Sequence, residues 1–151
     1  MGLRFFTVYG PYGRPDMAIY KFVKSITQNQ SINLYGKGEM LRDFTYIDDV
    51  IKCIVKIIER KTILSKNKNH EHHQVYNIGK GSPIKIKSLI RNIETILKKN
   101  ALINLKKITK GEMQKTYCSI DKFKKDFNYV PDTHIKDGLK SFINWYKSYK
   151  H

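Results

Sequence analysis

The stretch from Leu3 to Tyr20 constrains the fold most, because an apolar segment leads there directly into a loop rich in glycine and proline. The first part, LRFFTVY, contains the aromatic and β-branched residues that favour a buried strand, whereas GPYGRP interrupts regular structure. A helix is expected to begin near Asp16, whose carboxylate can cap its first N–H groups. Loops after buried parallel strands hold ligands in α/β proteins, so the stretch predicts either a binding loop or a plain structural turn.

Short apolar strands and amphipathic helices alternate along the rest of the chain, which predicts an α/β fold. Strands are expected at 32–35, 42–47, 75–78 and 103–108, and helices at 17–27, 49–61, 86–97, 119–127 and 135–146. Gly36 and Gly38 predict a hairpin between the strands at 32–35 and 42–47. The helix at 49–61, capped by Asp48, is expected to bury a stripe of isoleucine and valine, namely Ile51, Ile54, Val55 and Ile58.

The chain carries 29 Lys and Arg against 13 Asp and Glu, a formal net charge of +16. A basic surface attracts phosphate, so a nucleic-acid-binding function has to be weighed. The lysines are spread over nearly every predicted helix and loop, and no zinc-finger, helix-turn-helix or RNA-binding motif accompanies them. A solvated surface without a specific nucleic-acid partner is therefore the favoured interpretation.

Length and composition predict one ordinary domain, since 151 residues can bury a sizeable core. The sequence opens directly on an apolar strand, which leads us to expect a fragment of a larger α/β protein. Cys53 and Cys118 are expected to be reduced cytoplasmic thiols, and the most apolar window, Val50 to Ile58, is too short to span a membrane. Three histidines in the polar loop at 65–74 make only a weak metal-site candidate, so no metal is expected; they are His70, His72 and His73.

Three blocks in the same order resemble the extended short-chain dehydrogenase/reductases that epimerise nucleotide sugars: LRFFTVYGP with GRPDMA, INLYGKGEMLRDFTYIDDV, and VYNIG. Within that family the chain is most similar to the UDP-glucuronate 4-epimerases. The resemblance covers nearly the whole chain but only the second half of the family's length. It implies the last strands of a Rossmann-like parallel sheet, at 1–12 and 75–79, with 13–74 and 80–151 forming mainly a small mixed α/β substrate-binding subdomain and covering helices. The N-terminal nucleotide-binding part would be missing.

The catalytic and cofactor motifs of the family are not found in this sequence. No glycine-rich turn between a strand and a helix is available for the pyrophosphate of NAD, the cofactor of the full-length family enzyme. The catalytic Tyr-x-x-x-Lys pattern occurs at Tyr20 with Lys24 and at Tyr146 with Lys150, but both lie downstream of the expected position and are interpreted as chance matches. We therefore expect no catalytic residue, and incomplete NAD binding by this chain alone.

The resemblance places the sugar nucleotide at Arg42 and Tyr35. Arg42 matches the arginine that holds the UDP diphosphate, and its planar fork suits two phosphate oxygens at once. The alternative is a structural ion pair with Asp43 or Asp48. Tyr35 matches the residue that borders the uracil.

The remaining site residues are also implied only by the resemblance. Thr7 matches the position that faces the sugar, and Arg14 is expected near a hexuronate carboxylate. Glu112 stands where the family carries an aspartate near the ribose. Phe5 and Phe6 are expected to form a wall beside the nicotinamide.

The function implied is the UDP-sugar-binding portion of an NAD-dependent epimerase, which oxidises C4 of the sugar to a ketone and returns the hydride to the other face. We expect the chain to be inactive alone, and to have a complementary N-terminal half or a second copy as its protein partner. Two alternatives stay open. One is a dehydratase or decarboxylase of the same family, and the other is a noncatalytic basic protein that binds nucleotides or nucleic acid.

Overall fold

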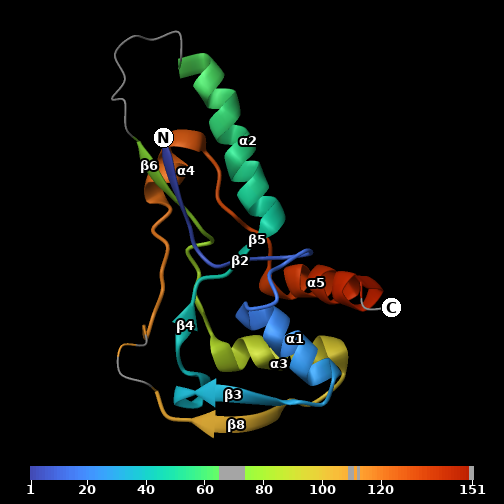
Figure 1. The fold of residues 1–151 in the computed structure, drawn as a ribbon. Helices are drawn as coiled ribbons and strands as arrows, with labels where there is room; N and C mark the ends of the chain where they lie inside the picture. Colours follow the sequence, from blue (N-terminus) through green and yellow to red (C-terminus); the bar gives the residue numbers. More distant parts are fainter. Residues whose placement is uncertain (65–73, 109–110, 112, 150–151) are drawn as a thin grey trace.

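The computed structural model describes residues 1–64, 74–108, 111 and 113–149 of the chain (Figure 1). The strands are β1 (Gly2–Phe5), β2 (Val8–Tyr9), β3 (Ser31–Tyr35), β4 (Leu41–Arg42), β5 (Thr45–Tyr46), β6 (Val75–Ile78), β7 (Ile84–Lys85) and β8 (Leu102–Lys106). The helices are α1 (Ala18–Thr27), α2 (Ile47–Leu64), α3 (Ile86–Leu97), α4 (Asp121–Phe127) and α5 (Ile135–Tyr149), and a short 3₁₀ turn covers Gly36–Gly38.

The strands form four separate pairs among the described residues. Three pairs are parallel, β1 with β6, β2 with β5, and β3 with β8, and only β4 with β7 is antiparallel. Parallel strands need long crossover connections, and helices supply them here. The α/β class with parallel strands is thus confirmed.

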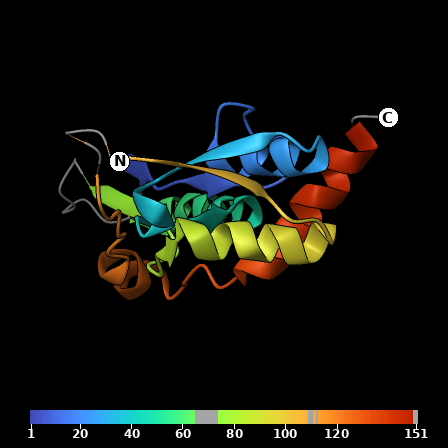
Figure 2. The ribbon, with the colours of Figure 1, turned by 90° about the horizontal axis from the view of Figure 1, so that it is seen from below.

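Two hydrophobic clusters hold these pairs together. The larger one lies between α1, α3, α5 and β3, and its most buried members include Val23, Leu89, Ile93 and Leu139. The smaller one joins α2 and α4 to β6. Figure 1 shows α2, β1, β6 and α4 at one end of the molecule and β3 with β8 at the other. Seen from below, β3 and β8 run side by side next to α3, and α5 lies at the far end (Figure 2).

The apolar stretch at the start of the chain is divided between two sheets, so the expectation of one continuous strand was wrong. The backbone N–H of Phe6 still donates to Ile78 O, at 3.0 Å. One residue later, Thr7 O accepts from the N–H of Thr45, at 2.9 Å, and the chain joins β5 instead. Thr7 therefore sits where the backbone passes from one strand pair to the other.

The predicted hairpin between 32–35 and 42–47 is also wrong. β3 pairs with β8, about seventy positions later in the sequence, whereas β4 pairs with β7 and β5 with β2. A regular strand over 42–47 would alternate its faces, but Asp43, Phe44 and Thr45 are all buried in succession. The conformation here is decided by pairing with strands that are distant in sequence. A local alternation of residues with a period of two does not identify those partner strands.

The buried face of α2 differs from the predicted stripe. Val50, Cys53 and Ile57 face the core, whereas Ile51 and Val55 are exposed. The helix carries isoleucine or valine on two neighbouring flanks, so an i, i+3, i+4 pattern fits either of them. Cys53 is completely buried.

The predicted cap of α1 and the serine before α4 both form other contacts. Asp16 pairs with Arg14, and α1 begins after Met17, without a side-chain cap. Ser119 donates its hydroxyl hydrogen to the Asp121 carboxylate and does not cap α4. In contrast, the predicted extents of α3, of β8 and of the terminal helix are confirmed within a few residues.

No helix in the described part of the chain is long and apolar enough to cross a membrane. The three loop histidines and Glu112 lie outside the described residues.

The carboxylate of Asp49, on the first turn of α2, ties the segment before α5 to the core. It is 1% exposed, accepts a hydrogen bond from the hydroxyl of Tyr129 at 3.1 Å, and accepts another from the backbone N–H of Thr133 at 3.0 Å. Burial and the nearby Asp49 charge raise the pKa of Tyr129, so its hydroxyl stays a donor.

We predict that Asp49→Ala lowers the free energy of unfolding by about 2–4 kcal/mol, because two partly buried donors lose a buried charged acceptor. Urea denaturation of the variant measures this loss. Asp137→Ala is the matched control, since the Asp137 side chain is exposed and pairs with Lys140 at 3.5 Å. Equal stability of the two variants would show that Asp49 does not hold this segment.

Candidate functional site

Two adjoining cavities lie where the first strands end. The larger one has a volume of about 520 Å³ and is lined by the end of β1, by β2, and by the loop that follows. The smaller one has a volume of about 270 Å³ and is lined by α1, β3 and β4. Thr7 and Met17 line both cavities, so the two form one elongated site.

The larger cavity has an apolar wall and a tight loop at its mouth. Phe5 and Phe6 line it together with Ile47 from the start of α2. In the loop, Gly10 has φ +150°, and a Cβ placed there would overlap the Ile47 side chain. Glycine is therefore required at this position, and the loop is pressed against α2.

The loop does not form a phosphate cradle. The N–H of Gly13 donates to Gly10 O, at 3.1 Å, which closes a turn and removes that donor from the cavity. A phosphate cradle instead presents several free N–H groups at the start of a helix. Tyr12 has φ +61°, and its ring lies 5.3 Å from that of Trp145, so the loop is braced against α5.

Arg14 lies at the open rim of the larger cavity. Its guanidinium forms a bidentate pair with Asp16, with Nε–Oδ1 at 3.0 Å and Nη2–Oδ2 at 2.6 Å. The pair lowers the pKa of the Asp16 carboxyl, first through the hydrogen bond to Arg14. Its side chains are 76% and 56% exposed, so a ligand can reach this cation without opening the core.

The smaller cavity brings together three of the residues implied by the resemblance: Thr7, Tyr35 and Arg42. They come from the strand switch, the end of β3 and the end of β4. Arg42 donates from Nη1 to Leu41 O at 2.9 Å and from Nη2 to the sulfur of Met40 at 3.8 Å. Its described contacts include neither Asp43 nor Asp48, so the structural ion pair considered from the sequence is not formed.

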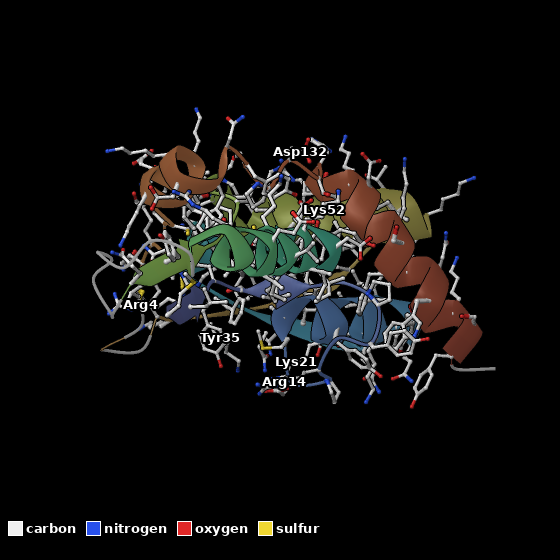
Figure 3. The ribbon with its side chains drawn as sticks, turned by 90° about the horizontal axis from the view of Figure 1, so that it is seen from above. Arg4, Arg14, Lys21, Tyr35, Lys52 and Asp132 are labelled. Carbon is white, nitrogen blue, oxygen red and sulfur yellow. The ribbon has the colours of Figure 1, made fainter. Side chains whose placement is uncertain are left out.

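The labelled side chains of Arg14 and Tyr35 lie along the same side of the molecule, opposite Lys52 and Asp132 (Figure 3). The two cavities therefore face one side, with a cation at the rim of one and an aromatic ring at the edge of the other.

Asp43 organises this region, although sequence reasoning assigned it no role beyond a possible partner of Arg42. Its side chain is completely buried, and Oδ2 accepts hydrogen bonds from the N–H groups of Gly81 and Cys118, both at 3.0 Å. Its own N–H donates to the hydroxyl of Thr116, at 3.1 Å. Asp43 thus fastens two distant segments beside Arg42, and the acidic residue directly after that arginine was the signal available in the sequence.

The segment at 114–116 is also hydrogen-bonded to β4 itself. The N–H of Leu41 donates to Gln114 O, and the N–H of Thr116 donates to Leu41 O, both at 3.0 Å. The chain that follows Glu112 is therefore anchored next to Arg42. Glu112 lies outside the described residues, so its ribose contact stays a prediction.

The two cysteines and Tyr20 have the buried surroundings that are typical of structural residues. Burial raises the pKa of both cysteine thiols, Cys53 and Cys118, to about 12, so neither is a ready thiolate. Tyr20, in one of the two matches to the catalytic pattern, is buried, with its ring 5.3 Å from Tyr146. The described residues contain no group of three acidic, histidine or cysteine side chains that could hold a metal ion.

The α/β fold agrees with what comparisons with known proteins show. Residues 1–79 match the profile of the NAD dependent epimerase/dehydratase family, and the chain belongs to this family.

Several named proteins are similar to this chain, with sequence identities of up to 40% among those given below. Protein CapI of Staphylococcus aureus is 39% identical over 98% of this chain and 47% of its own length. UDP-glucuronate 4-epimerase 4 of Arabidopsis thaliana is 40% identical over 98% of this chain and 36% of its own length. A crystal structure of UDP-glucuronic acid 4-epimerase from Bacillus cereus, in complex with UDP-glucuronic acid and NAD, superimposes with a TM-score of 0.84 at 35% identity, over 97% of this chain and 45% of that enzyme. The chain spans about half the length of the relatives it matches, or less.

The Arg14 and Asp16 pair yields a prediction about stability. Exposed ion pairs contribute little to folding, so Arg14→Ala and Asp16→Ala should leave the melting temperature of the chain unchanged. Thermal unfolding followed by circular dichroism checks this. A clear fall in melting temperature for both variants would mean that the pair is needed to fold the loop.

Proposed function

We propose that the chain is the C-terminal, UDP-sugar-binding portion of an NAD-dependent nucleotide-sugar epimerase, with UDP-glucuronate as the preferred sugar nucleotide. The observation that carries the proposal is the smaller cavity, where Thr7, Tyr35 and Arg42 meet. These residues are far apart in sequence, so their meeting is a property of the fold. The Bacillus cereus relative, which superimposes on 97% of the chain, was crystallised with UDP-glucuronic acid and NAD.

Each residue has a role that suits its chemistry. Tyr35 borders the uracil, and Arg42 binds the diphosphate, because a guanidinium can donate two parallel hydrogen bonds to phosphate oxygens. Glu112 accepts a hydrogen bond from the ribose. Thr7, shared by both cavities, faces the sugar at their junction, and Arg14 at the rim meets the hexuronate carboxylate.

The larger cavity supplies one side of a nicotinamide site. Phe5 and Phe6 form an apolar wall there, and NAD would supply the hydride acceptor when bound. The N–H of Gly13 is bonded to Gly10 O, so this donor of the loop is not free for a pyrophosphate. A complete NAD site thus requires a strand, turn and helix that this sequence does not contain.

The proposed function also divides the chain between two parts of the epimerase fold. In this proposal, residues 1–12 and 75–79 supply the strands of the nucleotide-binding sheet; the parallel pairing of β1 with β6 supports this for residues 2–5 and 75–78, whereas Val8 and Tyr9 pair with β5. Residues 13–74 and 80–151 form mainly the substrate-binding subdomain and its covering helices. The protein partner would be the complementary N-terminal half.

We predict that Arg42→Ala weakens UDP binding by about 1.5–3 kcal/mol, which is the usual strength of a hydrogen bond to a charged group. Isothermal titration of the folded chain with UDP measures the change, and Arg42→Lys should recover only part of the affinity because it lacks the fork. Arg91→Ala, which removes an exposed arginine on α3 outside both cavities, is the control. Equal UDP affinity of the Arg42→Ala and Arg91→Ala variants would remove Arg42 from the site.

The chain alone should not interconvert UDP-glucuronate and its C4 epimer when NAD is supplied. Among the described residues, tyrosines but no lysine line the two cavities, so none of these tyrosines has the lysine partner that the family's catalytic pattern requires. Chromatographic separation of the two epimers after long incubation tests this. Turnover that persists through purification and is lost in Tyr20→Phe would show that the buried tyrosine is catalytic after all.

A further inference from the structure

The loop between β2 and α1 carries an aromatic ring that does not belong to the hydrophobic core. Tyr12 is 83% exposed, yet it lines the larger cavity together with its neighbours in the loop. Its φ of +61° is a left-handed backbone conformation that glycine adopts freely and that is unfavourable for a residue with a Cβ. A tyrosine held in this conformation indicates that its ring makes a contact of some use.

Tyr12 stands at the third position of a tight turn. The N–H of Gly13 donates to Gly10 O, at 3.1 Å, and Pro11 occupies the second position. A proline followed by a residue with positive φ is the pattern of a type II turn, whose third position normally carries glycine or asparagine. Glycine would therefore suit the backbone better at position 12, and the tyrosine has to be explained by its ring.

The ring of Tyr12 contacts Trp145 on α5, the only tryptophan of the chain. The two ring centres lie 5.3 Å apart. Trp145 is itself surrounded by rings, with Phe142 at 5.5 Å and Tyr149 at 5.3 Å. Figure 1 shows the loop after β2 passing next to α5. The Tyr12–Trp145 contact thus attaches the loop to a helix from the other end of the sequence.

Arg14 depends on this loop for its place at the rim of the cavity. Its side chain is 76% exposed, and its guanidinium is bonded to Asp16, an exposed residue of the same loop. A pair within one loop moves with that loop, so it does not fix Arg14 relative to the cavity wall. The turn at 10–13 and the Tyr12–Trp145 contact connect Arg14 to the rest of the fold.

We propose that Tyr12 is a positioning residue: through its ring contact with Trp145 it holds Arg14 at the rim of the larger cavity. It thereby determines how strongly the site prefers a sugar nucleotide with a carboxylate on the sugar to one with a neutral hydroxymethyl group. The inference rests on the proposed function, because it takes Arg14 as the residue that meets the hexuronate carboxylate.

The physical reason is the geometry of the ion pair. A guanidinium meets a carboxylate through two parallel N–H···O bonds, which require the two planar groups to be aligned. A loop that is free to move has to be ordered when the ligand binds, and this ordering lowers the affinity. A neutral hydroxymethyl group forms no ion pair with Arg14, so its binding depends much less on where the loop lies.

The contact itself is tested without a ligand. Tyr12→Gly removes the ring and suits the positive φ, so the variant should fold as well as the unsubstituted chain. We expect faster hydrogen exchange at the amides of Gly13 and Met17, which close turns onto Gly10 O and Arg14 O. Acrylamide should also quench the fluorescence of Trp145 more strongly. Tyr12→Phe, which keeps the ring, is the matched control and should behave like the unsubstituted chain.

The consequence for ligands is measured by isothermal titration of the full chain with UDP-glucuronate and with UDP-glucose. Tyr12→Gly should lower the ratio of the two affinities, UDP-glucuronate over UDP-glucose, roughly fivefold or more, because the aligned ion pair is lost. Tyr12→Phe should keep the ratio. Unchanged exchange at both amides in Tyr12→Gly, or a ratio that Tyr12→Gly and Tyr12→Phe lower equally, would overturn the proposal.

A double variant distinguishes positioning from general support of the fold. If Tyr12 acts through Arg14, its ring has no effect on the ratio once Arg14 is replaced. Tyr12→Gly/Arg14→Ala should therefore give the same ratio as Arg14→Ala alone. Additive losses in the double variant would contradict the positioning role.

A titration with UDP separates this inference from the proposed function. UDP carries no sugar, so its affinity should be the same for Tyr12→Gly and for the unsubstituted chain. UDP binding together with an unchanged ratio in Tyr12→Gly would refute this inference alone. An unsubstituted chain that binds neither UDP nor UDP-glucuronate would refute the proposed function and this inference with it.

Discussion

Two backbone hydrogen bonds, one residue apart in sequence, determine how this chain is arranged. Phe6 donates to Ile78 in one strand pair, and Thr7 accepts from Thr45 in the next. The change of partner turns the chain out of the β1–β6 pair and opens both cavities beside Thr7. The apolar stretch and the glycine loop after it thus serve two sheets, and the candidate site lies at the transition between them.

Buried carboxylates keep the surrounding segments in place. Asp43 holds the turn after β6 and the segment at 114–118 beside Arg42, and Asp49 holds the approach to α5. Both accept hydrogen bonds from backbone N–H groups that would otherwise be buried without partners. The cavities are therefore bordered by segments that come from distant parts of the sequence and are held by charge-assisted bonds.

The sequence was sufficient for features that depend on local pattern or on resemblance. The periodicity of α3 and of the terminal helix predicted both elements, and the resemblance named Thr7, Tyr35 and Arg42 before the structure brought them together. Pairing of β3 with β8 could not be predicted from the glycine turn, because strand partners are chosen by non-local burial. The buried side of α2 was ambiguous for a related reason, since Lys56 and Arg60 of this helix lie over aromatic rings that only the fold brings near.

Nuclear magnetic resonance tests the central claim most directly, because it shows where UDP binds. If the cavity between α1, β3 and β4 is the nucleotide site, titration with UDP should shift the backbone amide signals of Thr7, Tyr35 and Arg42 in a saturable way. The amides of β8, which does not line this cavity, should stay unchanged. Shifts spread over the surface lysines and removed by salt, or no saturable shifts near Arg42, would contradict the assignment of this cavity to the sugar nucleotide.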